Sequence, residues 1–214
     1  MLGLEQLSLP VQVAAVVIPA AVYFLLLGLL NSQRTPQLLR ARTDFVLMVL
    51  AFFPIFAVPV LQYLGASYWT VLGMTALVSA AALLLAPGRK GNWVIYNLTL
   101  PETLRAVERA LRANGMAFDR RGKTLVVQGH DVSAKLAALP ILRNVTITLD
   151  GPGAAAMHEA FEQSLSDELA LIHAQTTPMA ATFLLISTVM LTTPLAVVAN
   201  RMPDMVRLIG DLVK

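Results

Sequence analysis

The stretch that decides the fold reads GRKGNWVIYNLTLPETLRAVERALRANGMAFDRRGKTLVVQGHDVSAKLAALPILRNVTITLD over residues 88–150. This stretch begins the only long segment that is polar enough to be exposed to water, and that segment continues to Pro178. The segment carries ten of the sixteen Lys and Arg residues and nine of the thirteen Asp and Glu residues. The sequence therefore predicts one hydrophilic block held between hydrophobic spans.

The composition of the whole chain is that of a membrane protein. Of its 214 residues, 57% are hydrophobic and only 14% are charged, whereas about a quarter of the residues of an ordinary soluble domain are charged. Cysteine is absent, which excludes disulfides, thiolate metal sites and cysteine nucleophiles together. The net charge of +3 is a basic excess of the size that topology-determining loops supply, so we do not infer nucleic-acid binding from it.

Four apolar runs are each long enough to cross about 30 Å of hydrocarbon as a helix. None of them contains an ionisable residue. Three lie within residues 1–87, at about 11–30, 45–63 and 68–86, and the fourth covers residues 179–199. We expect these runs to form a membrane-embedded four-helix bundle.

The arginines of the short loops predict the orientation. Arg34, Arg40 and Arg42 lie between the first two runs, and Arg89 and Lys90 follow the third. Because short loops rich in Lys and Arg stay in the cytoplasm, we expect a multi-pass protein of the cell (inner) membrane. Its N-terminus and C-terminus are outside, residues 88–178 are cytoplasmic, and residues 200–214 form an amphipathic tail on the outer surface.

Residues 88–150 are expected to form a small α+β domain. Apolar alternation, turn residues and helical spacing predict strands and helices in the order strand 93–98, helix 101–114, strands 116–120 and 124–128, helix 130–139 and strand 144–149. The order βαββαβ is that of the ferredoxin-like split motif. The predicted fold class is therefore an all-α membrane bundle with an inserted ferredoxin-like cytosolic domain.

Residues 151–178 connect this domain to the fourth span. Residues 154–174 predict one amphipathic helix, because apolar residues recur at helical spacing; they are Met157, Phe161, Leu165, Leu169 and Ile172. We expect this stripe to cover the small sheet, with a partner helix as the alternative.

One pair resembles a metal site. His158 and Glu162 are four residues apart, so on a helix they share a face. The second histidine of the zinc-protease pattern His-Glu-x-x-His is missing, and a solvated face is the default interpretation. We therefore predict no metal, and equally no cofactor or catalytic residue, because the sequence has no glycine-rich phosphate loop and no nucleophile elbow.

A group of cations marks a candidate binding surface on the block. Three fall on one side of the first domain helix and three at the predicted hairpin tip; we call them the basic surface, which comprises Arg105, Arg109, Arg112, Arg120, Arg121 and Lys123. Such cations can contact anionic lipid headgroups or a partner protein. Sequence-specific RNA binding by a sheet needs exposed aromatic residues, and Tyr96 and Phe118 alone do not supply them.

These features predict a non-enzymatic integral membrane protein. We expect a structural or regulatory subunit of a membrane complex that binds membrane lipid, and other subunits or itself, through its cytosolic domain. The alternative is a small transporter or channel component gated by that domain, because Pro19, Pro54, Pro59 and Pro194 could break helices around a central site. An enzyme ranks third and would require metal at His158 and Glu162.

Overall fold

The computed structural model describes residues 9–65, 67–88, 91–175 and 178–212. The chain divides into two compact units. One, which we call the sheet domain, comprises Leu27–Val46 and Ala86–Thr182. The other, the helical unit, comprises Met1–Leu26, Leu47–Leu85 and Phe183–Lys214. Arg89 and Lys90, used above to predict orientation, lie outside the described residues.

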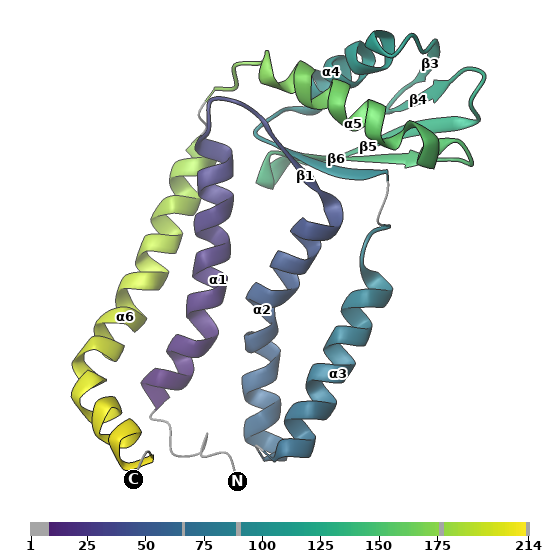
Figure 1. Ribbon diagram of the computed structural model, residues 1–214. Coiled ribbons are helices and arrows are strands. Elements are labelled where there is room, and N and C mark those ends of the chain that lie inside the picture. Colours follow the sequence, from purple (N-terminus) through teal and green to yellow (C-terminus); the bar gives the residue numbers. More distant parts are fainter. Residues whose placement is uncertain (1–8, 66, 89–90, 176–177, 213–214) are drawn as a thin grey trace. The chain divides into compact units, whose positions relative to one another are not determined.

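The four predicted spans are helices. They are α1 (Leu9–Ser32), α2 (Ala41–Leu64), α3 (Tyr68–Leu85) and α6 (Pro178–Leu212), labelled in Figure 1. Each contains a segment long and apolar enough to cross a membrane. Helix α6 is continuous to Leu212, so no break in the helix marks the predicted start of the tail at residue 200.

Aromatic side chains join three of these helices within the helical unit. The rings of Tyr23 in α1 and Phe52 in α2 have centroids 5.7 Å apart. Phe24 in α1 stacks on Phe183 in α6 at 6.0 Å. Helix α3 buries none of its residues, so a bundle of all four helices stays a prediction.

The sheet domain contains a six-stranded sheet in which every neighbouring pair is antiparallel. Its strands are β1 (Gln37–Arg40), β2 (Asn92–Tyr96), β3 (Phe118–Arg121), β4 (Thr124–Val127), β5 (Val132–Leu139) and β6 (Asn144–Asp150). They are ordered β1-β2-β6-β5-β4-β3. The hairpin predicted around residues 121–123 is confirmed, since Arg121 pairs with Thr124.

The core of the sheet domain lies between one face of the sheet and two helices, α4 (Leu100–Ala113) and α5 (Ala154–Ala170), which lie on the same side of the sheet in Figure 1. Alternate residues of the strands point into this core, as Val145, Ile147 and Leu149 of β6 do. The predicted apolar stripe of α5 is confirmed. Phe161 and Leu165 are fully buried against the sheet.

The helix predicted over residues 130–139 is wrong. Val132–Leu139 form strand β5, paired with β4 on one side and β6 on the other. Its alanines favour a helix locally, but Ala134 and Leu136 point into the core while the intervening residues point away from it. Two flanking strands supply hydrogen bonds along this segment, and tertiary pairing overrides propensity. The βαββαβ order therefore does not describe this domain.

The predicted loop between the first two spans holds a strand that was not predicted. Gln37–Arg40 pair with β2 as edge strand β1. After β1 the chain turns directly into α2, and the hydroxyl of Tyr96 donates a hydrogen bond to Oδ1 of Asp44 at 2.6 Å. Because side chains alternate along a strand, Tyr96 points away from Ile95 and the core. Helix α2 thus begins on the sheet face opposite α4 and α5.

Candidate functional site

The basic surface lies on α4 and on the β3–β4 hairpin, and all six of its side chains belong to exposed residues. An ion pair of 3.4 Å between Arg120 and Glu108 links the hairpin to the helix. Arg112 lies over the Phe118 ring, 5.5 Å from its centroid, a cation–π contact that also joins the two elements. The structure therefore brings Arg120 and Arg112 together on the α4 side of the sheet. Arg121, the next residue of β3, points to the opposite face.

Only Arg109 and Arg120 of this surface form ion pairs with described residues, and Arg112 contacts the Phe118 ring instead. Arg109 pairs with Glu168 of α5 at 2.6 Å. Arg105, Arg121 and Lys123, in contrast, form no ion pair with any residue that the structure describes. Their charges are available to a ligand or partner.

The start of α4 is fixed by a reciprocal cap. The Glu102 carboxylate accepts hydrogen bonds from the hydroxyl of Thr99 at 2.6 Å and from its backbone N–H at 2.9 Å. The hydroxyl bond is the main reason that the pKa of Glu102 lies below its usual range, and nearby Arg143 and Arg105 lower it further. This cap holds the first turn of α4, and Arg105 lies in the turn that follows.

His158 and Glu162 come together on α5, as their spacing predicted. Nε2 of His158 lies 3.2 Å from Oε2 of Glu162. Nδ1 of His158 accepts a hydrogen bond from the backbone N–H of Gly91 at 3.0 Å. The imidazole is buried and stacks on the indole of Trp93, with centroids 4.8 Å apart. One neutral tautomer, with its proton on Nε2, satisfies both contacts.

These contacts give His158 a structural role, because it links α5 to the segment that leads into β2. Both ring nitrogens already have protein partners, whereas a metal ligand needs one nitrogen lone pair free. Within the described ranges no group of three or more His, Asp or Glu side chains could hold a metal ion. Gly91 has φ of +80°, and a Cβ atom there would lie 3.0 Å from the carbonyl oxygen of Leu149. The backbone position that lets Gly91 donate its N–H to His158 therefore requires glycine.

A polar pocket of about 360 Å³ lies within the sheet domain, between the junction of β1 with α2 and the segment leading into β2. Its lining residues are Arg40, Arg42, Thr43, Gly88 and Asn92. Arg40 also reaches α5, where its Nη2 lies 3.3 Å and 3.4 Å from the two carboxylate oxygens of Glu162. Glu162 therefore joins His158 to one wall of the pocket.

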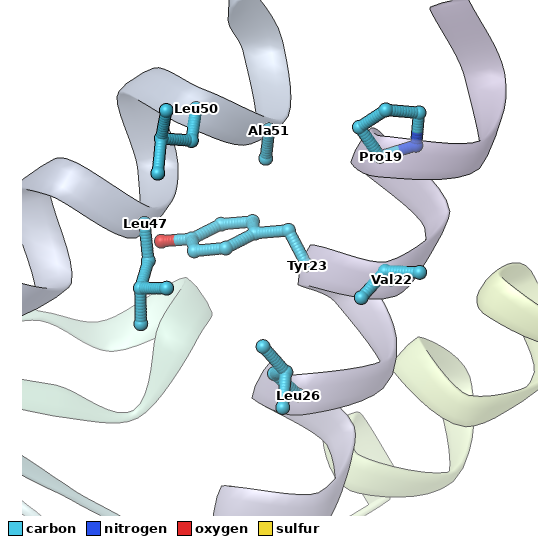
Figure 2. A pocket seen from close by; sticks show the side chains of 7 residues that line it. All are labelled: Pro19, Val22, Tyr23, Leu26, Leu47, Leu50 and Ala51. Atoms are coloured by element: carbon cyan, nitrogen blue, oxygen red, sulfur yellow. The ribbon is translucent and has the colours of Figure 1, made fainter. Parts of the chain in front are cut away.

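Two further pockets formed by described residues of the helical unit both lie between α1 and α2. The larger has a volume of about 240 Å³, and Figure 2 shows the Tyr23 ring extending between the two helices with its hydroxyl beside Leu47. Apart from Tyr23, its lining side chains are apolar; they are Pro19, Val22, Leu26, Leu47, Leu50 and Ala51. The smaller pocket is lined by valines and by Gln12 and Gln62, whose amides hydrogen-bond to each other at 2.6 Å.

No protein-family model matches this chain, and neither does any curated protein or solved structure. Function is therefore argued from the sites alone.

Sequence reasoning missed the polar pocket and the role of His158. Arg40 and Arg42 were interpreted only as topology signals, although their position immediately before and within the first turn of α2 could have indicated a binding site for anions. The contact between His158 and Gly91 joins residues 67 positions apart. No local pattern indicates a contact of that kind.

Proposed function

We propose that the protein is a non-enzymatic integral membrane subunit whose sheet domain, in the cytoplasm, binds another protein subunit through the basic surface. The observation that carries this proposal is the group of exposed cations on α4 and the β3–β4 hairpin, of which Arg105, Arg121 and Lys123 have no ion-pair partner among the described residues. A partner with an acidic face would supply the missing charges and steer association.

The acidic residues within the basic surface favour a protein partner over lipid. Arg109 and Arg120 form ion pairs with Glu168 and Glu108, so carboxylates lie among the cations. An anionic membrane surface would repel these carboxylates, whereas a protein partner can match a surface of mixed charge.

The two described pockets between α1 and α2 give little support to the transport alternative, since the glutamine amides of the smaller pocket already bond to each other. A solute pathway needs convergent polar groups near the middle of the spans. The pocket in Figure 2 has one polar side chain, that of Tyr23, so we propose only the subunit function.

The first test is a charge reversal at the proposed surface. The full-length protein, extracted from its native membrane in mild detergent, should migrate as a complex larger than a monomer. The substitution Lys123→Glu should weaken that complex by about tenfold or more, because an acidic partner would face a like charge. Arg34→Glu is the matched control, since Arg34 is also exposed and forms no ion pair with the described residues. A monomer in the wild type, or equal effects of the two reversals, contradicts the proposal.

The second test concerns the cytoplasmic location. Because the chain has no cysteine, a single introduced thiol can be labelled without a background signal. With a membrane-impermeant maleimide, Tyr63→Cys should react in intact cells and Lys123→Cys only after the membrane is permeabilised. Labelling of Lys123→Cys in intact cells would place the sheet domain outside and remove the cytoplasmic partner from the proposal.

A further inference from the structure

The polar pocket of the sheet domain is built from the ends of two membrane-spanning helices. Arg40 immediately precedes α2, and Arg42 and Thr43 belong to its first turn. Gly88 lies three residues after the end of α3 at Leu85, and Asn92 begins β2. In a spanning protein the ends of apolar helices lie at the depth of the lipid headgroups. The position of these residues in the sequence therefore places the pocket at the membrane surface.

The pocket is rich in donors for a negatively charged oxygen ligand. Arg40, Arg42 and Thr43, whose side chains carry donors, line it together with Asn92, whose amide also donates to the carbonyl oxygen of Gly88 at 3.5 Å. Arg42 forms no ion pair with any residue in the described part of the chain. Guanidinium forks match phosphate oxygens in two-point contacts, and the first turn of α2 adds backbone N–H groups that have no acceptor within the helix.

Two side chains of α5, His158 and Glu162, contact residues on two walls of the pocket or next to them. Glu162 accepts from Arg40 at 3.3 Å, and His158, which contacts Glu162, accepts from the N–H of Gly91, the residue before Asn92. His158 itself is buried and stacks on Trp93, whereas the Arg40–Glu162 end of this connection is exposed. His158 and Glu162, whose spacing in the sequence resembles a metal site, thus help to position the pocket walls.

We propose that this pocket binds a negatively charged phosphate group, with Arg42 as its principal cation. An anionic phospholipid headgroup and free inorganic phosphate share this chemistry. This site is separate from the basic surface on α4. Loss of phosphate binding would therefore leave the proposed protein partner untouched, and loss of the partner would leave the pocket intact.

The test measures the melting temperature of the full-length protein in a non-ionic detergent. The added probes are dihexanoyl phosphatidylglycerol, the zwitterionic dihexanoyl phosphatidylcholine, and sodium phosphate against sodium chloride at equal ionic strength. The variants are Arg42→Gln and, as matched control, Arg34→Gln, which removes one charge from the same connection between α1 and α2 but lies outside the pocket. Thr43→Val is a second pocket variant. It removes the hydroxyl but keeps the volume of the Thr43 side chain, which is exposed.

Phosphatidylglycerol or phosphate should raise the melting temperature of the wild type and of Arg34→Gln alike. Arg42→Gln should need at least about fivefold more ligand for the same shift, because one cation near an anionic surface contributes a factor of about that size. A shift with phosphatidylglycerol but not with phosphate assigns the site to a lipid headgroup, and equal half-saturating concentrations assign it to free phosphate. If Arg42→Gln fails to fold, weaker binding by Thr43→Val carries the same conclusion. No shift with either anion, or equal responses of Arg42→Gln and Arg34→Gln, overturns the proposal.

Discussion

The hydroxyl of Tyr96 donates a hydrogen bond to Oδ1 of Asp44 at 2.6 Å, and this contact joins β2 to the first turn of α2. Tyr96 is fully buried. A hydrogen bond from a hydroxyl to a charged carboxylate is stronger than one between two neutral groups. The first turn of α2 is therefore held against the sheet by a charge-assisted bond, on the face that α4 and α5 leave uncovered.

The substitution Tyr96→Phe tests this bond. It removes the hydroxyl while keeping the ring, and it should lower the free energy of unfolding by about 1–3 kcal/mol because Asp44 loses its donor. Chemical denaturation of the full-length protein in detergent measures the change. Tyr63→Phe is the control, since Tyr63 is 90% exposed and its hydroxyl should contribute almost nothing. Equal stability of the two variants contradicts the prediction.

The features that the sequence predicted correctly depend on local pattern. Four apolar runs became four helices, and the stripe on α5 became part of the core. The β3–β4 hairpin formed around Gly122, which has φ of +64° and so occupies a conformation that favours glycine. Strand β1 was missed because its partner β2 lies far along the chain, whereas β5 was missed although it pairs with its sequence neighbours β4 and β6. Gln37–Arg40 has no apolar alternation, and the alanines of Val132–Leu139 favour a helix.

Two alanines in β5 distinguish the strand from the expected helix. Ala134 is fully buried and Ala137 is exposed. Residues three apart share a face on a helix but lie on opposite faces of a strand. Ala134→Asp should lower the free energy of unfolding by more than about 3 kcal/mol, because it buries an unpaired charge. Ala137→Asp should change it by less than about 1 kcal/mol. Similar losses from both substitutions, measured by denaturation, would contradict the strand.

In the candidate sites too, local sequence pattern predicted only the contacts between residues close in the sequence. The sequence correctly placed His158 beside Glu162, because a helix brings residues four apart together. It could not show that Gly91 donates to the other imidazole nitrogen or that Trp93 stacks on the ring. Those contacts depend on how α5 packs on the sheet. The exposure of the α4 arginines was easier to predict, because an exposed helix face needs only helical spacing; the binding role of the basic surface stays a prediction.

The substitution His158→Phe separates stacking from hydrogen bonding. The phenyl ring can still stack on Trp93, but the N–H of Gly91 loses its buried acceptor, which costs about 1–3 kcal/mol. Hydrogen exchange should show faster exchange of the Gly91 amide in this variant. His130→Phe, at an exposed position, should leave that amide as protected as in the wild type. Unchanged protection in His158→Phe would mean that the imidazole is not the acceptor.

The lowered pKa of Glu102 predicts how the cap of α4 responds to acid. A carboxylate with a lowered folded-state pKa stabilises the fold above its unfolded-state pKa, and this contribution is lost as the pH falls through the folded-state value. Glu102→Gln should therefore be less stable than the wild type at neutral pH, by less than about 1 kcal/mol because solvent screens this partly exposed group. The difference should disappear in acid, where the wild-type side chain is also uncharged. Denaturation of both proteins across the acid range measures it. Glu159→Gln, at an exposed position of α5, is the control. A difference that persists in acid would show that the Thr99 bond does not depend on the charge of Glu102.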